Sequence, residues 1–191
     1  AWQTIDHRQG PERSGKSKCR PSEARWIARE VRRLLVDEGV EANNIGIISF
    51  YRAQVDVLLE ALVAEDIAER DPDSGLIDIQ PRWQTIERQD GKREERLRVG
   101  TVDAFQGKEF DVVFLSITRS NTLPAETEDH RRAKYGHLML ANRLCVAMSR
   151  QRKLLVAVGD RAMFNTEQAR EAVPGLAHFL TLCGGEDGLV T

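Results

Sequence analysis

Apolar residues recur along the chain in two kinds of pattern. Spacing of three and four residues predicts helices buried on one face, one beginning near Ser22 as its N-cap and ending at Gly39, another near Val55. Short, nearly continuous apolar runs predict buried strands at residues 45–50, 97–102, 112–118 and 154–158. Further helices are predicted at about 140–150, 162–172 and 175–182. This alternation predicts an α/β fold, a mostly parallel sheet with helices on both faces.

Three polar segments interrupt the pattern. Residues 6–21 are rich in Arg, Lys, Gly and Ser, which predicts a surface loop. Residues 65–98 read as an insert, in which Asp90-Gly91 between strand-like flanks predicts a hairpin. Residues 122–135 form a charged loop. Since 191 residues with 41% hydrophobic content suit one core, residues 1–191 are predicted to form a single domain.

Composition limits the classes of partner and compartment. A formal net charge of −2 gives no global attraction to phosphates, so any nucleic-acid surface must be local. Cys19, Cys145 and Cys183 are widely spaced and fit neither a disulfide framework nor a zinc site. The four histidines are scattered, and no metal site is predicted. Without a run of roughly 20 apolar residues the protein is predicted to be soluble, with no membrane partner, and cytoplasmic. The start at Ala1 suggests part of a longer protein.

Candidate chemistry lies where a parallel sheet binds its ligands, beyond the carboxyl ends of the strands. Tyr51, Arg52 and Gln54 follow the first long strand and offer an aromatic face, a guanidinium and an amide, which can stack a base and reach a phosphate. After the next strand, Gln106 and Glu109 offer hydrogen bonds beside a glycine that permits close backbone approach.

A second set of candidates lies on the helix predicted at 140–150. Three- and four-residue spacing places Arg143, Ala147 and Arg150 on roughly one helical face. Two arginines within an otherwise apolar segment favour a binding site over an ordinary solvated helix surface. By contrast, the basic residues of the 65–98 insert are interleaved with acidic ones, which favours a salt-bridged exposed hairpin, with strand contact the minority hypothesis.

The motifs, taken in order, resemble those of the C-terminal RecA-like domain of superfamily 1 helicases, in the subgroup of the nonsense-mediated-decay helicase and its bacterial relatives. Residues 102–109, with Arg119-Ser120-Asn121 after the next strand, are similar to the fifth helicase motif of that group. Residues 142–152 are similar to the sixth motif and residues 47–54 to the fourth. The resemblance covers nearly the whole chain outside 65–96 and 122–135, and it implies a RecA-like P-loop NTPase fold.

The resemblance implies an ATP-dependent helicase whose ATP and Mg²⁺ sit against an upstream RecA-like domain, so that the isolated chain is inactive. That upstream domain would hold the Mg²⁺ and supply the phosphate loop. Arg150 and Arg52 would be the catalytic residues, reaching the γ-phosphate as arginine fingers. Tyr51 would pack on the base or sugar of the nucleotide. The implied nucleotide-binding residues are Tyr51, Gln54, Gln106, Gly107, Glu109 and Arg143.

Single-stranded DNA or RNA is the second implied ligand. Its backbone would be contacted, without sequence readout, by Thr101, Asp103, Ser120 and Asn121. Asn142, Cys145 and Ser149 stand where relatives often have arginine, asparagine and threonine, which are mild departures that leave Arg143 and Arg150 in place.

The chain is expected to lack a phosphate-binding loop of its own. Residues 10–17 fit the formula G-x-x-x-x-G-K-[ST], but no strong strand or apolar helix is predicted beside them, which favours a chance match. A different class of function therefore remains open: a stand-alone nucleic-acid or protein-binding adaptor without ATPase activity. Salt-dependent binding of single strands by the lone chain, with no motor domain upstream in its gene, would favour the adaptor.

Overall fold

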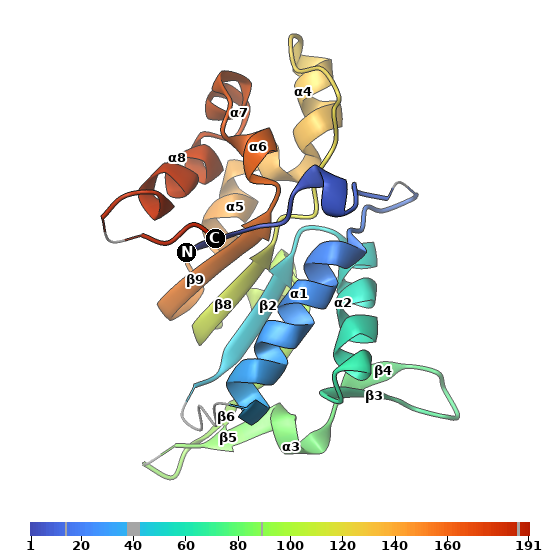
Figure 1. Ribbon diagram of the computed structural model, residues 1–191. Helices are drawn as coiled ribbons and strands as arrows, with labels where there is room; N and C mark the ends of the chain where they lie inside the picture. Colours follow the sequence, from blue (N-terminus) through green and yellow to red (C-terminus); the bar gives the residue numbers. More distant parts are fainter. Residues whose placement is uncertain (14, 38–42, 89, 187) are drawn as a thin grey trace.

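Five parallel strands form the main sheet of the protein, shown in Figure 1. The computed structural model describes residues 1–13, 15–37, 43–88, 90–186 and 188–191. The spatial order is β1-β9-β8-β2-β7, and the bounds are Trp2–Thr4 for β1, Gln151–Gly159 for β9, Phe110–Ser116 for β8, Ile45–Ser49 for β2 and Leu97–Thr101 for β7. The predicted parallel sheet is confirmed. Its edge strand β1 was not predicted, because three residues are too few to show a pattern.

Both faces of the sheet are covered by helices. On one face lie α1 (Pro21–Arg32), continued by a π-helical turn η2 (Arg33–Asp37), and α2 (Arg52–Ala64). The other face carries η3 (Val102–Phe105), α5 (Ala141–Ala147), α6 (Arg161–Phe164), α7 (Glu167–Ala172) and α8 (Pro174–Cys183). Along β8 the side chains alternate between the two cores, with Phe114 facing α1 and Leu115 facing the opposite layer. This double burial explains the continuous apolar runs in the sequence.

The insert and the charged loop contain short elements of their own. The insert folds as an antiparallel pair β3 (Ala68–Arg70) and β4 (Ile77–Ile79), helix α3 (Pro81–Gln84), and a second pair β5 (Thr85–Glu87) and β6 (Arg93–Glu95). The predicted hairpin around Asp90 and Gly91 is thus confirmed. The remaining elements are η1 (His7–Gln9), α4 (Glu128–Tyr135) and η4 (Gly136–Met139).

Two predicted helix boundaries were wrong. Helix α1 begins at Pro21 with Arg20 as its N-cap, because proline fits the first helical position; Ser22, predicted as the N-cap, therefore lies inside the helix. Helix α5 ends at Ala147, so Arg150 lies after the helix rather than on it. Gly39, predicted to end the first helix, lies outside the described residues.

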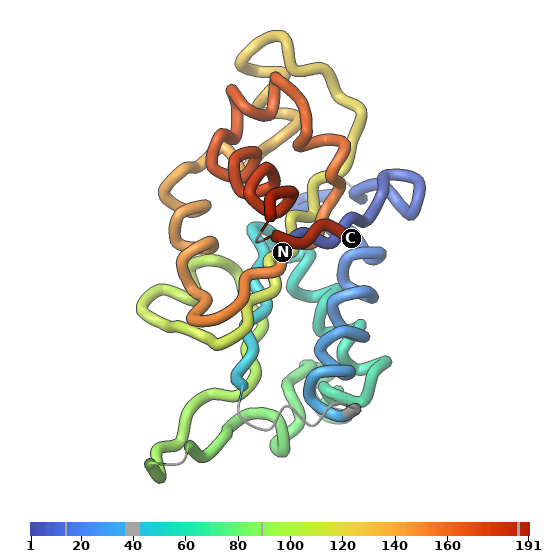
Figure 2. Tube along the Cα trace, turned by 60° about the vertical axis from the view of Figure 1, so that its left-hand side comes forward, coloured from blue at the N-terminus to red at the C-terminus, as the bar shows by residue number. Residues whose placement is uncertain are grey.

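The two ends of the chain lie side by side, as Figure 2 shows. The backbone N–H of Thr191 donates to the carbonyl of Trp2 at 3.0 Å, on the β1 edge of the sheet.

Among the described helices, none is long and apolar enough to cross a membrane.

Candidate functional site

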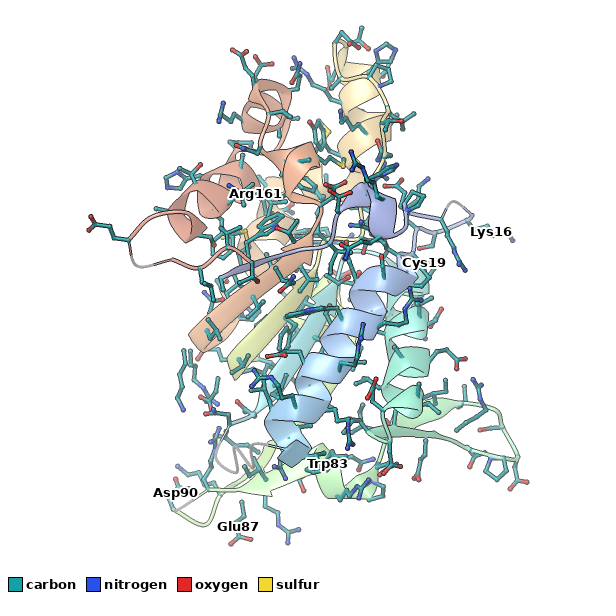
Figure 3. All side chains as sticks on the ribbon, viewed as in Figure 1. Lys16, Cys19, Trp83, Glu87, Asp90 and Arg161 are labelled. Atoms are coloured by element: carbon teal, nitrogen blue, oxygen red, sulfur yellow. The ribbon has the colours of Figure 1, made fainter. Side chains whose placement is uncertain are left out.

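The predicted site residues fall into two groups at opposite ends of the sheet. Tyr51 and Arg52 follow β2 at its carboxyl end, whereas Gly107 and Arg150 precede β8 and β9 at their amino ends. Eight strand residues at about 3.3 Å each separate Arg150 from the level of Arg52 by roughly 25 Å. Figure 3 gives the same division, with Lys16 near the carboxyl ends and Asp90 near the amino ends.

This division corrects the prediction that all candidates share the carboxyl edge. Residues 102–109 connect the carboxyl end of β7 to the amino end of the parallel strand β8, so this one segment must run the length of the sheet. Its first residues therefore stay at the carboxyl edge and its last at the amino edge. Arg52 and Arg150 cannot both act on one phosphate in this arrangement, so the prediction that both reach the γ-phosphate does not fit this structure.

A polar cleft of about 400 Å³ lies at the amino ends of the strands. We call it the amino-end cleft; its lining residues are Asn44, Glu94, Glu95, Gly107, Lys108, Glu109, Phe110, Arg150 and Arg152. It brings together Gly107 and Glu109 from one motif with Arg150 from another. Glu109 and Arg150 are 41 residues apart in the sequence.

The guanidinium of Arg150 contacts only neutral acceptors. Its Nε donates to the carbonyl of Val146 at 3.0 Å, its Nη2 to Ser149 Oγ at 2.8 Å, and its Nη1 to the carbonyl of Lys108 at 3.4 Å. It forms no ion pair with any residue that the structure describes. A half-exposed positive charge without a carboxylate partner in an open cleft is suited to binding an anion.

The loop that faces Arg150 is anchored by a buried aromatic ring. Gly107 has a φ of +74°, which glycine adopts without strain, and Gln106 and Glu109 beside it are exposed. Phe105 is fully buried against Gly46 in the neighbouring strand, where a Cβ would lie 2.8 Å from the Phe105 ring. Because Gly46 has no side chain, the Phe105 ring can pack against β2, and this contact holds the loop in place.

A second polar pocket, of about 270 Å³, lies at the carboxyl ends of the strands. We call it the carboxyl-end pocket; it is lined by Gly15, Lys16, Ser17, Lys18, Tyr51, Arg119, Gly136 and His137. The backbone N–H of Ala53, in the first turn of α2, donates to Ser17 Oγ at 3.3 Å. Sequence reasoning missed Lys16 and Lys18, which lie in a loop, and His137, which lies in the short 3-10 helix η4, because none of these segments has a periodic signal. Burial, and then the nearby charge of Arg143, hold the pKa of His137 below its ordinary value.

Tyr51 and Gln54 are buried, which corrects their predicted contact with a nucleotide. The hydroxyl of Tyr51 accepts a hydrogen bond from the backbone N–H of His137 at 3.2 Å, and burial raises the pKa of that hydroxyl. The side chain of Gln54 accepts from the Arg20 N–H at 2.6 Å and donates to Ser116 Oγ at 2.9 Å. Gln54 therefore ties α1, α2 and β8 together, and Tyr51 supports the η4 backbone.

The predicted strand-contacting residues differ in how accessible they are. Asp103 is exposed and pairs with Arg143, so Arg143 also belongs to the carboxyl end, away from Arg150. Thr101 is half-buried. Asn121 is half-buried and donates to Glu12 Oε2 at 2.9 Å. Ser120 is fully buried, and its hydroxyl donates to Asp160 Oδ2 at 2.7 Å, which leaves it no free face for a ligand.

A buried ion pair that sequence reasoning missed fixes the carboxyl end of β8. The carboxylate of Glu23 accepts hydrogen bonds from Arg20 Nη1 at 3.1 Å, Ser116 Oγ at 2.7 Å and the Thr118 N–H at 2.8 Å. Burial raises the pKa of Glu23 to about 7, although the charge of Arg20 opposes that rise. Thr118 has a φ of +69°, rare for a β-branched residue, and its bond to Glu23 helps hold this turn before Arg119.

The match to the phosphate-loop formula in residues 10–17 does not have the required geometry. A phosphate loop places its Lys and Ser at the start of the following helix. Here Lys16 and Ser17 lie in the loop, and α1 begins only at Pro21. The three-residue strand β1 ends at Thr4, and η1 separates it from Gly10, so residues 10–17 do not directly connect a strand to a helix. The position of Lys16 before the helix also argues against a phosphate loop.

Comparison with known proteins identifies the family. The chain matches the profile of a family described as an AAA domain over residues 1–162. The chain belongs to this family. Together with the parallel sheet and the three motifs in order, this match confirms the resemblance to the C-terminal RecA-like domain of superfamily 1 helicases, and the domain is a helicase-family domain.

Two relatives and one solved structure illustrate the likeness. Over 159 residues the chain is 29% identical to the helicase required for RNAi-mediated heterochromatin assembly 1 of Schizosaccharomyces pombe, which covers 78% of this chain. Over 121 residues, 63% of this chain, it is 35% identical to the DNA polymerase alpha-associated DNA helicase A of Saccharomyces cerevisiae. The chain spans 13% of the length of either protein.

The solved structure is the C-terminal domain of a possible DNA helicase from Lactobacillus plantarum. It has 14% identity and a TM-score of 0.45, covering 83% of this chain and 71% of that one.

Proposed function

We propose that this chain is the second motor domain of an ATP-dependent DNA or RNA helicase, and that Arg150 acts as its arginine finger. A nucleotide held by the phosphate loop of another RecA-like domain would lie across the amino-end cleft. The observation that carries the proposal is that the guanidinium of Arg150 bonds only neutral acceptors, because a cation already paired with a carboxylate would have to break that pair to meet a phosphate.

The residues around Arg150 fit a triphosphate ligand. The backbone at Gly107 is open, with no heavy atom within 4 Å of the position a Cβ would take, so a ligand can approach it closely. Gln106 and Glu109 are exposed beside it and would take the nucleotide contacts implied by the family motif. The Mg²⁺ would be held by the domain that carries the phosphate loop, and it would neutralise the phosphate charge during transfer. This chain would then supply the guanidinium charge from the opposite side.

Single-stranded nucleic acid would bind at the other end of the sheet. The exposed residue Asp103 and the half-buried residue Thr101 remain candidates for positioning the strand. The carboxyl-end pocket adds Lys16, beside the first turn of α2, as a partner for the phosphate backbone. Lys18 lines the same pocket and would have to exchange its contact with Glu12 Oε1, at 3.7 Å, for a phosphate. With a net charge of −2 the chain needs a local group of positive charges to bind nucleic acid, and the lysines of this pocket supply one.

The arginine finger is tested in the intact polypeptide that carries this domain. We expect Arg150→Ala to reduce the nucleic-acid-stimulated kcat for ATP by roughly a thousandfold or more, with little change in ATP binding. Arg70→Ala is the matched control, because Arg70 lies in β3 and pairs on the surface with Glu60. Full turnover by Arg150→Ala would refute the assignment. An intact protein that binds single strands but never hydrolyses ATP would support the adaptor function instead.

The strand site is tested by the salt dependence of binding. We expect the double variant Lys16→Ala with Lys18→Ala to weaken binding of a fluorescent oligothymidine and to lower the slope of log K against log salt by about 1 to 2. The control removes two lysines at the amino ends, Lys92→Ala with Lys153→Ala, and keeps the net charge equal. Equal slopes for the two double variants would place the strand elsewhere.

A further inference from the structure

An ion cluster borders the amino-end cleft beside Arg150. It consists of Arg88, Glu94, Asp111 and Arg152, and we call it the amino-end cluster. Arg152 Nε lies 3.1 Å from Asp111 Oδ1, and Arg152 Nη2 lies 3.4 Å from Glu94 Oε2. Arg88 Nη2 lies 2.9 Å from Glu94 Oε2 and 3.0 Å from Asp111 Oδ2. Each carboxylate is therefore shared by the same two guanidinium groups, and Lys153 Nζ also lies 3.7 Å from Asp111 Oδ2.

The hairpin β5–β6 supplies half of the cluster. Arg88 follows β5 and Glu94 lies in β6, whereas Asp111 and Arg152 lie near the amino ends of β8 and β9. Arg152 also donates to Asn44 Oδ1 at 2.9 Å, just before β2. The insert, predicted as an exposed hairpin with strand contact as the minority hypothesis, thus contributes Glu94 to the lining of the amino-end cleft and Arg88 to the cluster beside it.

The cluster contains charges that would otherwise act on Arg150 and on its ligand. Arg150, Arg152 and Glu94 all line the amino-end cleft. The hydrogen bond from Arg88 lowers the pKa of Glu94. Burial raises the pKa of Asp111, but Arg88 and Arg152, together with the Asn44 N–H and Lys153, outweigh burial and lower it. Both groups are carboxylates at neutral pH. Left unpaired, they would repel a triphosphate and attract the guanidinium of Arg150.

We propose that Arg152 and Arg88 compensate the carboxylates of Glu94 and Asp111, and so leave Arg150 free to meet the nucleotide. Arg152 is then a positioning residue for the nucleotide cleft. The inference rests on the proposed function, since it concerns the same cleft. The alternative is a stapling role, in which the cluster only attaches the hairpin β5–β6 to the sheet. In that case the loss of each further ion pair would weaken ATP binding further.

The two roles give opposite results in one experiment on the intact polypeptide. We expect Arg152→Gln to raise KM for ATP about tenfold, the order expected for one uncompensated charge near a ligand in a partly dry cleft. Adding Glu94→Gln removes the surplus negative charge, so Arg152→Gln with Glu94→Gln should return KM to within about threefold of wild type. Arg152→Lys, which keeps the charge, should also stay near wild type. A stapling role predicts that the double variant is worse than Arg152→Gln.

Matched controls separate this inference from folding and from the proposed function. Asp66 and Arg82 form an ion pair at 2.6 Å elsewhere in the insert, and Arg82→Gln with and without Asp66→Asn should leave KM unchanged. If Arg150→Ala abolishes turnover but Arg152→Gln leaves KM unchanged, or Glu94→Gln fails to restore it, this inference alone is overturned. If Arg150→Ala keeps full turnover, the proposed function falls first, and this inference with it.

Discussion

The buried carboxyl group of Glu23 gives the protein a stability that should depend on pH in an unusual direction. Its pKa rises from the ordinary 4.5 to about 7 on folding, chiefly through burial. The folded chain therefore binds this proton more tightly than the unfolded chain. This tighter proton binding adds to the free energy of unfolding. The added free energy is fully present below pH 4.5 and is lost as the pH rises through about 7. At about 1.4 kcal/mol per tenfold change in proton affinity, the loss amounts to about 3 kcal/mol.

Replacing Glu23 with glutamine isolates this contribution. Other carboxyl groups titrate identically in wild type and variant, so they cancel in the difference between the two free energies of unfolding. Glu23→Gln also removes the attraction between Arg20 and the ionised carboxylate, which is already included in the pKa of about 7. The remaining difference, between glutamine and the protonated carboxyl group, does not change with pH. We therefore expect the difference, wild type minus variant, to fall by about 3 kcal/mol between pH 4.5 and pH 8.

Urea unfolding followed by far-UV circular dichroism at four or five pH values measures this difference. Glu30→Gln, on the same helix and half-exposed, controls for exchanging a carboxyl group for an amide. A difference that stays constant from pH 4.5 to pH 8 would refute the reasoning, because it would mean that burial does not shift the proton affinity of Glu23. A difference that rises with pH would mean that Arg20 outweighs burial.

Three further substitutions test the geometry of the two sites. Gly46→Ala places a Cβ 2.8 Å from the buried Phe105 ring and should cost about 1 to 3 kcal/mol of unfolding free energy in urea; an unchanged midpoint would contradict the packing. Gly107→Ala meets no neighbour within 4 Å but adopts a φ of +74°, so it should cost only about 1 kcal/mol in the same assay, and a larger loss would mean crowding. Arg52→Ala, at the far end of the sheet from Arg150, should keep kcat for ATP within about threefold, where loss of an arginine finger would give about a thousandfold decrease.

Much of the fold follows from residue patterns because burial on both faces of a parallel sheet leaves a strong signal. The four long strands show it as continuous apolar runs, and the helices show one apolar face. The hairpin at Gly91 was predictable from its turn residues, and Gly91 has a φ of +79°. The strand β1 gave no such signal, since Trp2 to Thr4 is too short for any period to appear.

The site was less predictable, because residues 102–109 both follow one strand and precede the next, and the sequence does not show how far along the sheet each of them lies. The motifs named Gly107, Glu109 and Arg150 as partners, and the amino-end cleft does bring them together. The same reasoning grouped Arg52 with Arg150. In the structure Arg52 follows β2 and Arg150 precedes β9, so the two residues lie at opposite ends of the sheet. Burial of Gln54 and Tyr51 also escaped prediction, since a polar side chain gives no sign in the sequence of whether its partners lie within the protein.

The two ends of the sheet are nonetheless joined by one short structural path. Helix α5 packs against η3, so the first half of residues 102–109 lies against this helix. At the carboxyl end they are linked by the pair Asp103 and Arg143, and at the amino end by the Arg150 guanidinium on the Lys108 carbonyl. Phe105 fixes the middle of this path against the sheet. Under the proposed function, a strand that moves Asp103 would pull on the same segment that holds Arg150, and a nucleotide that draws Arg150 away from Lys108 would release it.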